Sequence, residues 1–237
     1  MIGSTLARLA IAAGIDVVMS NSRGPDSLTD LIDELGVHAH ASDPAGAAQE
    51  GDLVVATIPL HAYKELPVDA LAGKTVIDTM NYYPDRDGRI ARLDADEVTS
   101  SELIQRHLSR SSVVKAANNI VFQHLWNLAR PAGTADRSAL PIAGDDESAK
   151  LRVAELLDRL GYNVVDTGSL ADSWRMEPNT PVYCKPYMAV PPASLPPEDL
   201  QPWIFQSQAI PAPATSIKDL MASAARGPAG GTTMRFD

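Results

Sequence analysis

Ser22 and Arg23 are the side chains of this sequence best suited to bind a phosphate. They belong to the polar segment 20–24, which follows a short apolar run. This segment lies about 20 residues after Gly3, where a dinucleotide-binding fold contacts the ribose of the adenosine. An acidic residue at that position binds NAD, whereas a hydroxyl and a planar guanidinium donate hydrogen bonds to a 2′-phosphate. The pair therefore predicts NADP rather than NAD, and a solvated polar turn is the alternative interpretation.

Ile2 and Gly3 open directly into a helical pattern. Gly3 stands where the last glycine of a G-x-G-x-x-G turn lets a helix pack closely on a sheet, and Met1 and Ile2 then occupy the two variable positions. This alignment predicts a phosphate-binding turn whose first strand and first two glycines lie upstream of Met1. An ordinary helix start is the alternative.

Three further polar segments follow apolar runs. In an open α/β sheet the ligand crevice lies beyond the carboxyl ends of the strands, so residues that follow strands are candidates for ligand contact. Residues 57–59 could border a nicotinamide, and the amide side chains of Asn81, Asn118 and Asn119 could hydrogen-bond a carbonyl or amide of a substrate. None is a strong general base, so we predict no catalytic side chain; a strand end and a helix cap are the structural alternatives. The residues are Thr57, Ile58 and Pro59, then Asn81, then Asn118 and Asn119.

His61 is the one histidine of five that stands near this expected crevice. His38 and His40 share one face of a predicted strand, but no third ligand is evident near them, and a zinc site needs at least three protein ligands. We therefore predict no metal site, and partly exposed side chains for both.

The overall charge is acidic, with 20 Lys and Arg against 30 Asp and Glu and a net charge of −10. Non-specific binding to nucleic acid or to a membrane surface is therefore not expected. Arg106, Arg110 and Lys115 form a local basic stretch that could meet an anionic tail of a ligand, although we favour a solvated face. The single Cys184 excludes an internal disulfide, and no apolar run reaches the ~18 residues of a membrane span. We expect a cytoplasmic protein.

The elements that must position these residues follow from the apolar pattern. Leu6, Leu9, Ala10 and Ala13 lie on one helical face, and Gly14 follows them as a left-handed helix end. The pattern recurs twice, and each helix precedes a continuous apolar run, which is typical of a buried parallel strand. This alternation predicts an α/β fold with a doubly wound, mostly parallel Rossmann sheet, N-terminally truncated by its first strand. The helices are residues 4–13, 28–35 and 153–160, and the apolar runs are residues 17–19, 37–41, 53–58, 75–77, 113–116 and 163–165.

The composition changes near Trp174, after which 11 of the 18 prolines stand. Proline removes the backbone donors that helices and strands require. We therefore predict an NADP-binding domain with its crevice in residues 1–173 and a Pro-rich extension in residues 174–237. Trp174, Trp203 and Phe205 indicate that parts of the extension pack on the domain, whereas residues 226–237 resemble a frayed end. A disordered extension throughout is the alternative.

Five stretches, taken together and in order, carry a family resemblance: residues 2–7 (IGSTLA), 21–25 (NSRGP), 57–60 (TIPL), 78–84 (DTMNYYP) and 113–118 (VVKAAN). With them the chain resembles the NADPH-dependent coenzyme F420 reductases (F420H2:NADP oxidoreductases), whose dinucleotide domain is similar to that of the STEAP metalloreductases. The resemblance implies hydride transfer between the nicotinamide C4 of NADPH and C5 of a deazaflavin, with the two rings stacked in the crevice.

The same resemblance implies roles for single residues. Ser22 and Arg23 would bind the 2′-phosphate, residues 57–59 would line the nicotinamide, and Asn118 and Asn119 would face the second ring. Such a transfer needs no protein acid or base at the carbon centres, so proximity and orientation would supply the catalysis.

We therefore predict an oxidoreductase that transfers a hydride between NADPH and coenzyme F420 or a related deazaflavin or flavin-like acceptor, with NADP(H) as cofactor, F420 as co-substrate and a homodimer as the assembly. An NADPH-dependent reductase of another small molecule, such as an imine, a quinone or a chelated metal, is the first alternative. A non-catalytic NADP-binding protein is the second.

Overall fold

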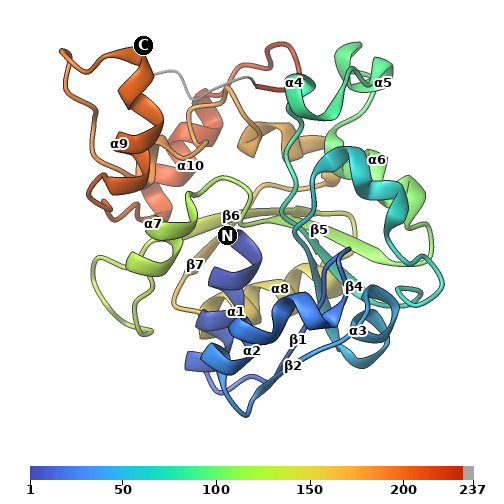
Figure 1. Cartoon of the computed structure of the whole chain (residues 1–237). Helices are drawn as coiled ribbons and strands as arrows, with labels where there is room; N and C mark the ends of the chain where they lie inside the picture. Colours follow the sequence, from blue (N-terminus) through green and yellow to red (C-terminus); the bar gives the residue numbers. More distant parts are fainter. Residues whose placement is uncertain (232–237) are drawn as a thin grey trace.

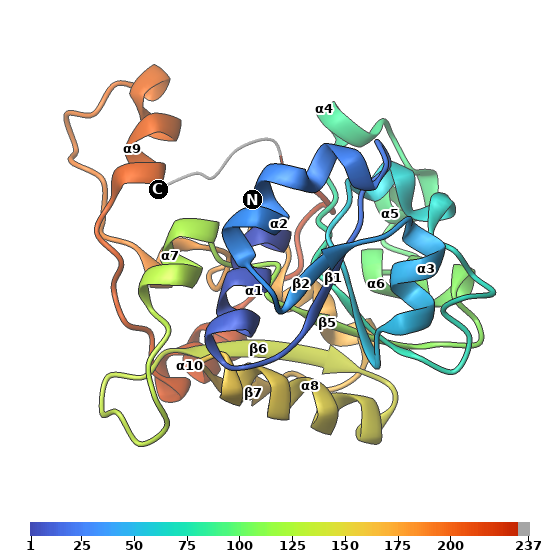
Figure 2. The same ribbon diagram turned by 60° about the horizontal axis from the view of Figure 1, so that its bottom comes forward.

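Helices surround two sheets in the structure, a computed structural model that describes residues 1–231 (Figures 1 and 2). The strands are β1 (Val17–Met19), β2 (Ala39–Ala41), β3 (Leu53–Ala56), β4 (Thr75–Asp78), β5 (Ser112–Ala116), β6 (Ala139–Gly144) and β7 (Asn163–Asp166). The α-helices are α1 (Ile2–Ala12), α2 (Thr29–Leu35), α3 (Pro44–Glu50), α4 (Pro84–Asp87), α5 (Ala91–Asp94), α6 (Ser100–His107), α7 (Phe122–Asn127), α8 (Glu147–Arg159), α9 (Leu200–Gln206) and α10 (Ala214–Ser223). The 3-10 helices are η1 (Pro25–Leu28), η2 (Leu60–Glu65), η3 (Leu170–Met176), η4 (Lys185–Tyr187) and η5 (Pro197–Asp199). None of these described helices has the length and apolar character needed to span a bilayer.

The larger sheet has the strand order β3-β4-β5-β6-β7, and β1 and β2 form a separate parallel pair. Strands β3, β4 and β5 are parallel, as are β6 and β7, while β5 and β6 run antiparallel. The predicted α/β fold with a mostly parallel sheet is therefore confirmed. Strand β6 lies outside the predicted apolar runs because Pro141 interrupts it. Pro141 pairs with β7 but lies beyond the register with β5, which runs from Ile142 to Gly144, so its missing N–H removes no bond to β5.

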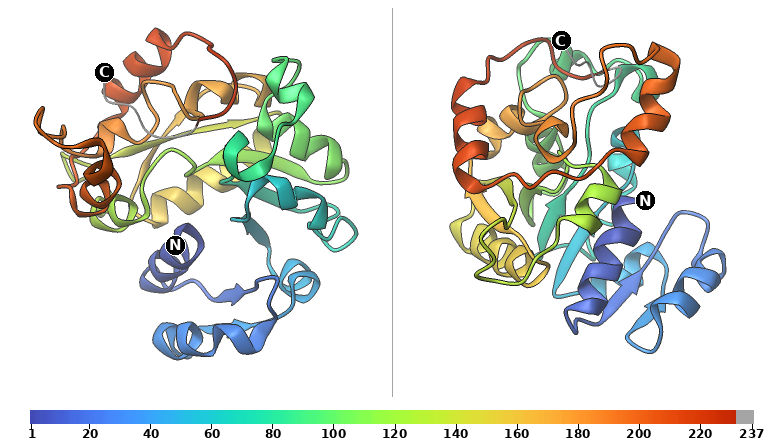
Figure 3. Two further views of the ribbon diagram at one scale, coloured as in Figure 1. Left: turned by 45° about the horizontal axis from the view of Figure 1, so that its top comes forward. Right: turned by 90° about the vertical axis from the view of Figure 1, so that its left-hand side faces the viewer.

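The two sheets are separated by a break between β1 and β3. In the described residues β1 pairs with β2 and β3 pairs with β4, so each has one edge without a strand partner. Figure 3 shows β1 and β2 set apart from the larger sheet, with α1 beside them. In a doubly wound sheet the first strand lies between the second and the fourth. The break therefore falls where the sequence predicts the first strand, and a strand upstream of Met1 stays a prediction.

The predicted helix ends are confirmed at the glycines. Gly14, Gly36 and Gly161 follow α1, α2 and α8 closely and have positive φ angles of 69°, 80° and 104°. At Gly161 a Cβ atom would also lie 2.7 Å from the backbone nitrogen of Arg130. Because glycine alone tolerates both the angle and the contact, Gly161 can turn the chain from α8 into β7.

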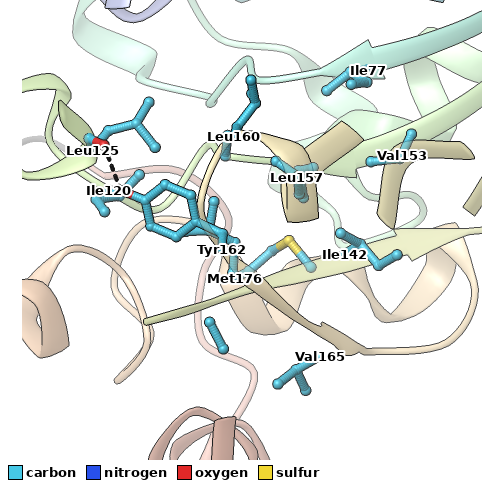
Figure 4. Close-up of a cluster of buried hydrophobic side chains, with 14 of the residues drawn as sticks. Ile77, Ile120, Leu125, Ile142, Val153, Leu157, Leu160, Tyr162, Val165 and Met176 are labelled. Carbon is cyan, nitrogen blue, oxygen red and sulfur yellow. Dashed lines mark hydrogen bonds between the residues drawn. The ribbon is translucent and has the colours of Figure 1, made fainter. Parts of the chain in front are cut away.

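The main core lies between α8, α1 and the larger sheet, and Figure 4 shows part of it. Val153, Leu157 and Leu160 are at most 4% exposed, as the helical pattern of this segment predicts. The Tyr162 hydroxyl donates a hydrogen bond to the Leu125 carbonyl, so the one polar atom of this buried ring is satisfied.

The stretch after Trp174 supplies part of the same core. The Tyr187 hydroxyl donates to the Ala139 carbonyl of β6 at 2.9 Å. Parts of the Pro-rich stretch therefore pack against the preceding residues. The domain boundary between residues 173 and 174 stays a prediction. The residues that this stretch contributes are Met176, Val182, Tyr187, Ala212, Ile217 and Met221.

Residues 226–231 make specific contacts, so the predicted frayed end is wrong for this segment. Arg226 Nε lies 3.7 Å from Asp96 Oδ1, and the Gly231 N–H donates to the Tyr82 carbonyl at 3.2 Å. The Gly230 carbonyl accepts from Asn179 Nδ2 at 2.6 Å. These partners lie far away in the sequence, so composition does not reveal them. The rest of the predicted frayed end, residues 232–237, lies outside the described residues.

Candidate functional site

The start of α1 lies against the loop that follows β3. A Cβ atom at Gly3 would stand 2.7 Å from Thr57 Oγ1, so a larger residue would have to displace the threonine or the helix. The last glycine of a phosphate-binding turn is required for this kind of close approach. No side chain caps the N-terminus of α1, and the free N–H groups of a helix start bind phosphate oxygens. The structure thus brings Gly3 next to Thr57; Ile2 precedes Gly3 at the start of α1, and Ile58 and Pro59 continue the loop of Thr57.

Ser22 and Arg23 lie in the exposed loop after β1. Asn21 shapes this loop, because its Oδ1 accepts from the Arg23 backbone N–H at 2.8 Å and its Nδ2 donates to Ser27 Oγ at 2.9 Å. Among residues 1–231, neither Ser22 nor Arg23 has a side-chain hydrogen bond or ion pair. An exposed guanidinium without a protein partner can bind a phosphate bidentately, so this loop fits a 2′-phosphate.

Asn81 and Asn118 bind each other across the ends of β4 and β5. Asn81 Nδ2 donates to the Asn118 carbonyl at 2.8 Å, and Asn118 Nδ2 donates to Asn81 Oδ1 at 3.0 Å and to the Met176 carbonyl at 2.8 Å. Asn118 is 4% exposed, and its Oδ1 has no partner among the described residues. A buried amide oxygen without a partner is costly, and a donor on a ligand would satisfy it.

The Oδ1 of Asn119, like that of Asn118, has no partner among the described residues, but the Asn119 amide nitrogen binds the C-terminal stretch, which favours a structural role. Asn119 is fully buried, and its Nδ2 donates to the Val182 carbonyl at 3.0 Å and to the Tyr187 hydroxyl at 3.3 Å. Its carbonyl accepts from the Cys184 N–H at 2.9 Å. Neither asparagine caps α7, whose N-cap residue is Val121 without a side-chain cap, so the helix-cap alternative is wrong. Contact of Asn119 with an acceptor ring stays a prediction.

Lys115 is fully buried, so the solvated face predicted for the basic stretch is wrong at this residue. Its Nζ lies 3.2 Å from Asp78 Oδ2 and 3.1 Å from Ser100 Oγ, and it also donates to the Met80 carbonyl. The register of β4 and β5 places Asp78 opposite Lys115. The pair fixes the start of the loop that carries Asn81, a support that sequence reasoning missed because the strand register is not visible in the sequence.

Two phenols and a thiol lie close together next to the Asn81 loop, which continues into Tyr83. The hydroxyls of Tyr83 and Tyr183 are hydrogen-bonded to each other. Burial raises the pKa of both phenols, and burial raises the pKa of the Cys184 thiol to about 12. All three groups therefore stay protonated near neutral pH, and none of them is a base or a nucleophile there.

Three of the five histidines pair with a carboxylate. His38 and His40 pair with surface carboxylates and are 61% and 58% exposed, so the predicted partial exposure is confirmed. His61 lies at the start of η2, and its Nδ1 stands 3.0 Å from Asp87 Oδ1. Among the described residues no group of three or more His, Cys, Asp or Glu side chains could hold a metal ion.

Residues 1–82 match the family model described as NADP oxidoreductase, coenzyme F420-dependent. The family resemblance that the sequence motifs indicate is therefore confirmed for this part of the chain. The matched segment contains the start of α1, the Ser22–Arg23 loop, residues 57–59 and Asn81, which together form most of the candidate site.

Known proteins share the fold over most of this chain. Protein SMa0349 of Sinorhizobium meliloti has a TM-score of 0.63 and 29% sequence identity, and an Arthrobacter protein described as an F420-dependent NADP-reductase has a TM-score of 0.62 and 26% identity. Each similarity covers 73% of this chain and 82% of the other. Rat metalloreductase STEAP3 is 28% identical over 175 residues, which are 73% of this chain and 33% of that protein. The chain spans 39% and 33% of the length of two curated relatives that it matches.

Proposed function

We propose that this chain binds NADP(H) and transfers a hydride between the nicotinamide and coenzyme F420 or a related deazaflavin or flavin-like acceptor. The close approach of Gly3 to Thr57 carries the proposal. It sets a helix start suited to a pyrophosphate against a loop suited to a nicotinamide. The family match over residues 1–82 and the similarity to the Arthrobacter protein support the same chemistry.

The chain's own residues bind the cofactor at three places in this proposal. Backbone N–H groups at the start of α1 receive the pyrophosphate, Ser22 and Arg23 donate to the 2′-phosphate, and residues 57–59 line the nicotinamide. NADPH, when bound, supplies the hydride. The net charge of −10 makes these local donors necessary, because the rest of the protein repels a polyanionic cofactor.

The acceptor lies above the Asn81–Asn118 pair in this proposal. Asn118 Oδ1, which lacks a partner among the described residues, accepts from an N–H of the acceptor ring. Asn81 holds Asn118 in place through two hydrogen bonds, one to the Asn118 backbone carbonyl and one from its side-chain amide. Because hydride transfer depends steeply on the distance and angle between donor and acceptor carbons, orientation by these amides is their contribution to the rate.

Two measurements on the purified protein test the proposal. Fluorescence titration with NADPH and NADH should show tighter binding of NADPH. Absorbance of F420 should then fall when NADPH and the protein are both present. Absence of NADPH binding contradicts the whole proposal, whereas binding with no turnover of any acceptor would indicate a nucleotide-binding protein without this activity.

A second candidate function is reduction of a chelated metal by NADPH. The similarity to metalloreductase STEAP3, which extends over 73% of this chain, favours this candidate. The same assay with a ferric chelate in place of F420 separates the two. Reduction of the chelate without reduction of F420 would make the metal reductase the better assignment.

A further inference from the structure

We propose that His61, held by Asp87, transfers the proton that accompanies the hydride, and that the acceptor is therefore a conjugated ring or imine in which a heteroatom is protonated on reduction. This inference rests on the proposed function and adds to it a catalytic side chain and an acceptor class.

The geometry of His61 is that of an oriented acid–base imidazole. Nδ1 stands 3.0 Å from Asp87 Oδ1, and the Asp87 side chain is 0% exposed whereas the His61 side chain is 49% exposed. A carboxylate accepts hydrogen bonds only, so Nδ1 carries a proton toward Asp87. Nε2, on the opposite side of the ring, then takes up or releases the second proton.

Asp87 is a permanent anion near neutral pH. Burial by itself would raise the pKa of this carboxyl, but hydrogen bonds from Arg86, from the Tyr83 N–H and from His61 outweigh burial and lower the pKa below its ordinary value. Arg86 donates from Nε to Oδ1 at 2.8 Å and from an Nη to Oδ2 at 2.9 Å. A carboxylate that stays charged keeps accepting from the Nδ1–H, so the ring is held in one orientation and Nε2 is the nitrogen that can exchange a proton with a ligand.

A continuous set of hydrogen bonds joins this imidazole to the candidate acceptor site. His61 follows residues 57–59, and Asp87 and Arg86 lie in α4, which follows the Asn81 loop (Figure 1). Arg86 donates to the Asn81 carbonyl at 2.9 Å, and Asn81 is bonded to Asn118. The loop that suits the nicotinamide and the loop that suits the acceptor are thus held together through the carboxylate that orients His61.

The other histidines lack this combination. The carboxylates that face His38 and His40 are 86% and 49% exposed, and both pairs lie by the smaller sheet. His124 is buried, and burial lowers its pKa. Among the described residues, His61 alone pairs a half-exposed ring with a fully buried carboxylate. Lys64 of η2 and His107 of α6 both lie against the Tyr63 ring.

The proton step balances with the hydride step. The acceptor carbon gains a hydride from NADPH, which is oxidised to NADP⁺, and the electron pair displaced from the acceptor double bond takes the proton from His61 Nε2. The N–H bond at Nε2 breaks and an N–H or O–H bond forms on the acceptor. Neutral His61 then regains a proton from water, and in the reverse direction it acts as the base. A chelated metal gains electrons without a proton, so its reduction gives His61 no role.

His61→Gln is the test variant, because glutamine keeps an N–H that can donate to Asp87 but has no titrating group. His40→Gln is its matched control, since His40 also pairs with a carboxylate, at 2.8 Å, but lies on β2. For the wild type, we expect kcat/KM for the acceptor to fall as pH rises from about 6 to 8, where imidazoles lose their proton. His61→Gln should lower kcat/KM at pH 6 by about 10²-fold, the lower range for general acid catalysis, and flatten the profile. His40→Gln should behave as the wild type.

Two readouts besides turnover complete the experiment. The dissociation constant of NADPH should change by less than about twofold in His61→Gln. Imidazole NMR spectra should show the His61 Nε2 resonance shifting when the acceptor is added to the NADP⁺-bound protein, with His40 unchanged. Two results would overturn the proton-transfer role alone. The first is a His61→Gln protein whose rate and pH profile equal those of the wild type, and the second is an Nε2 resonance that does not shift when the acceptor is added. Failure of the wild type to bind NADPH would overturn the proposed function first.

Discussion

Arg23 and Lys115 carry the same charge in opposite surroundings. Arg23 is exposed and its guanidinium has no partner within residues 1–231, whereas Lys115 is fully buried against Asp78, Ser100 and the Met80 carbonyl. A buried charge must be paired by the protein, but an exposed cation is free to pair with a ligand. The role of Arg23 is therefore tested by cofactor binding, and that of Lys115 by the free energy of unfolding.

Replacement of Arg23 by alanine should change cofactor selectivity. A charged hydrogen bond contributes about 1.5–3 kcal/mol, so Arg23→Ala should weaken NADPH binding by that amount and leave NADH binding nearly unchanged. Selectivity then falls at least tenfold. Fluorescence titration with both cofactors measures this, and Arg92→Ala, at an exposed arginine of α5 paired with Glu97, is the control. Equal losses for the two cofactors would show that Arg23 supports the loop without reading the phosphate.

The sequence predicts an exposed, ligand-binding residue such as Arg23 better than a buried, paired residue such as Lys115. Arg23 is predictable because its place follows from a strand end and from its separation from Gly3, both local features. Lys115 and Asp78 are 37 residues apart and meet through the register of two strands. The His61–Asp87 pair, 26 residues apart, depends in the same way on how two loops fold back. Long-range polar pairs are therefore the part of the site that pattern reasoning misses.

At the scale of elements, the Lys115–Asp78 pair joins β4 to β5. Lys115→Met leaves a buried carboxylate without its cation, which typically costs about 3–5 kcal/mol of unfolding free energy. Urea denaturation measures the loss, and adding Asp78→Asn should recover part of it because the double variant removes both charges of this pair. Arg8→Ala is the control, since Arg8 pairs with Glu34 at the surface, where ion pairs contribute at most about 1 kcal/mol. Equal effects of Lys115→Met and Arg8→Ala would contradict the account.

The start of α8 makes the protein sensitive to acid. Asp146 accepts from Ser148 Oγ, from the Ala149 N–H and from Ser112 Oγ of β5, and these bonds lower its pKa from 3.8 to about 2. Because the folded pKa lies below the unfolded one, this carboxylate stabilises the fold above pH 3.8, and the contribution disappears as pH falls toward 2. In Asp146→Asn, unfolding free energy should therefore depend less on pH within that window. Identical pH dependence in urea titrations of both proteins would argue against this role of Asp146.

Strands and helices with local signals could be predicted from the sequence. Helices closed by glycine and continuous apolar runs account for α1, α2 and α8 and for every strand except β6. Strand β6 is not predicted because Pro141 disfavours a strand. Proline is tolerated there because Pro141 lies outside the antiparallel register with β5. The contacts of residues 226–231 are not predicted because composition does not indicate the distant partners of Arg226 and Gly230.

For the whole molecule, the packing of the C-terminal stretch on the sheet has a thermodynamic consequence. Met176, Tyr187, Ile217 and Met221 lie in the same cluster as Leu140 and Val153. Residues that share one core lose their packing together, so the chain should unfold in one cooperative transition despite its proline-rich end. A separate domain after residue 173 would unfold in a transition of its own.

The last prediction tests this cooperativity with one buried residue and two fluorescent probes. Ile217 of α10 is fully buried in the main core, so Ile217→Ala should lower the unfolding free energy by about 2–5 kcal/mol. Val190→Ala, at a side chain that is 86% exposed, should change it by less than about 0.5 kcal/mol. Urea transitions are followed in two proteins that retain a single tryptophan, either Trp126 in α7 or Trp203 in α9. Because α7 contributes Leu125 to the core of Ile217 and Phe122 to the cluster that holds Trp203, Ile217→Ala should shift the two transitions equally. A shift confined to Trp203, with Trp126 unchanged, would show that the C-terminal stretch folds separately from the sheet.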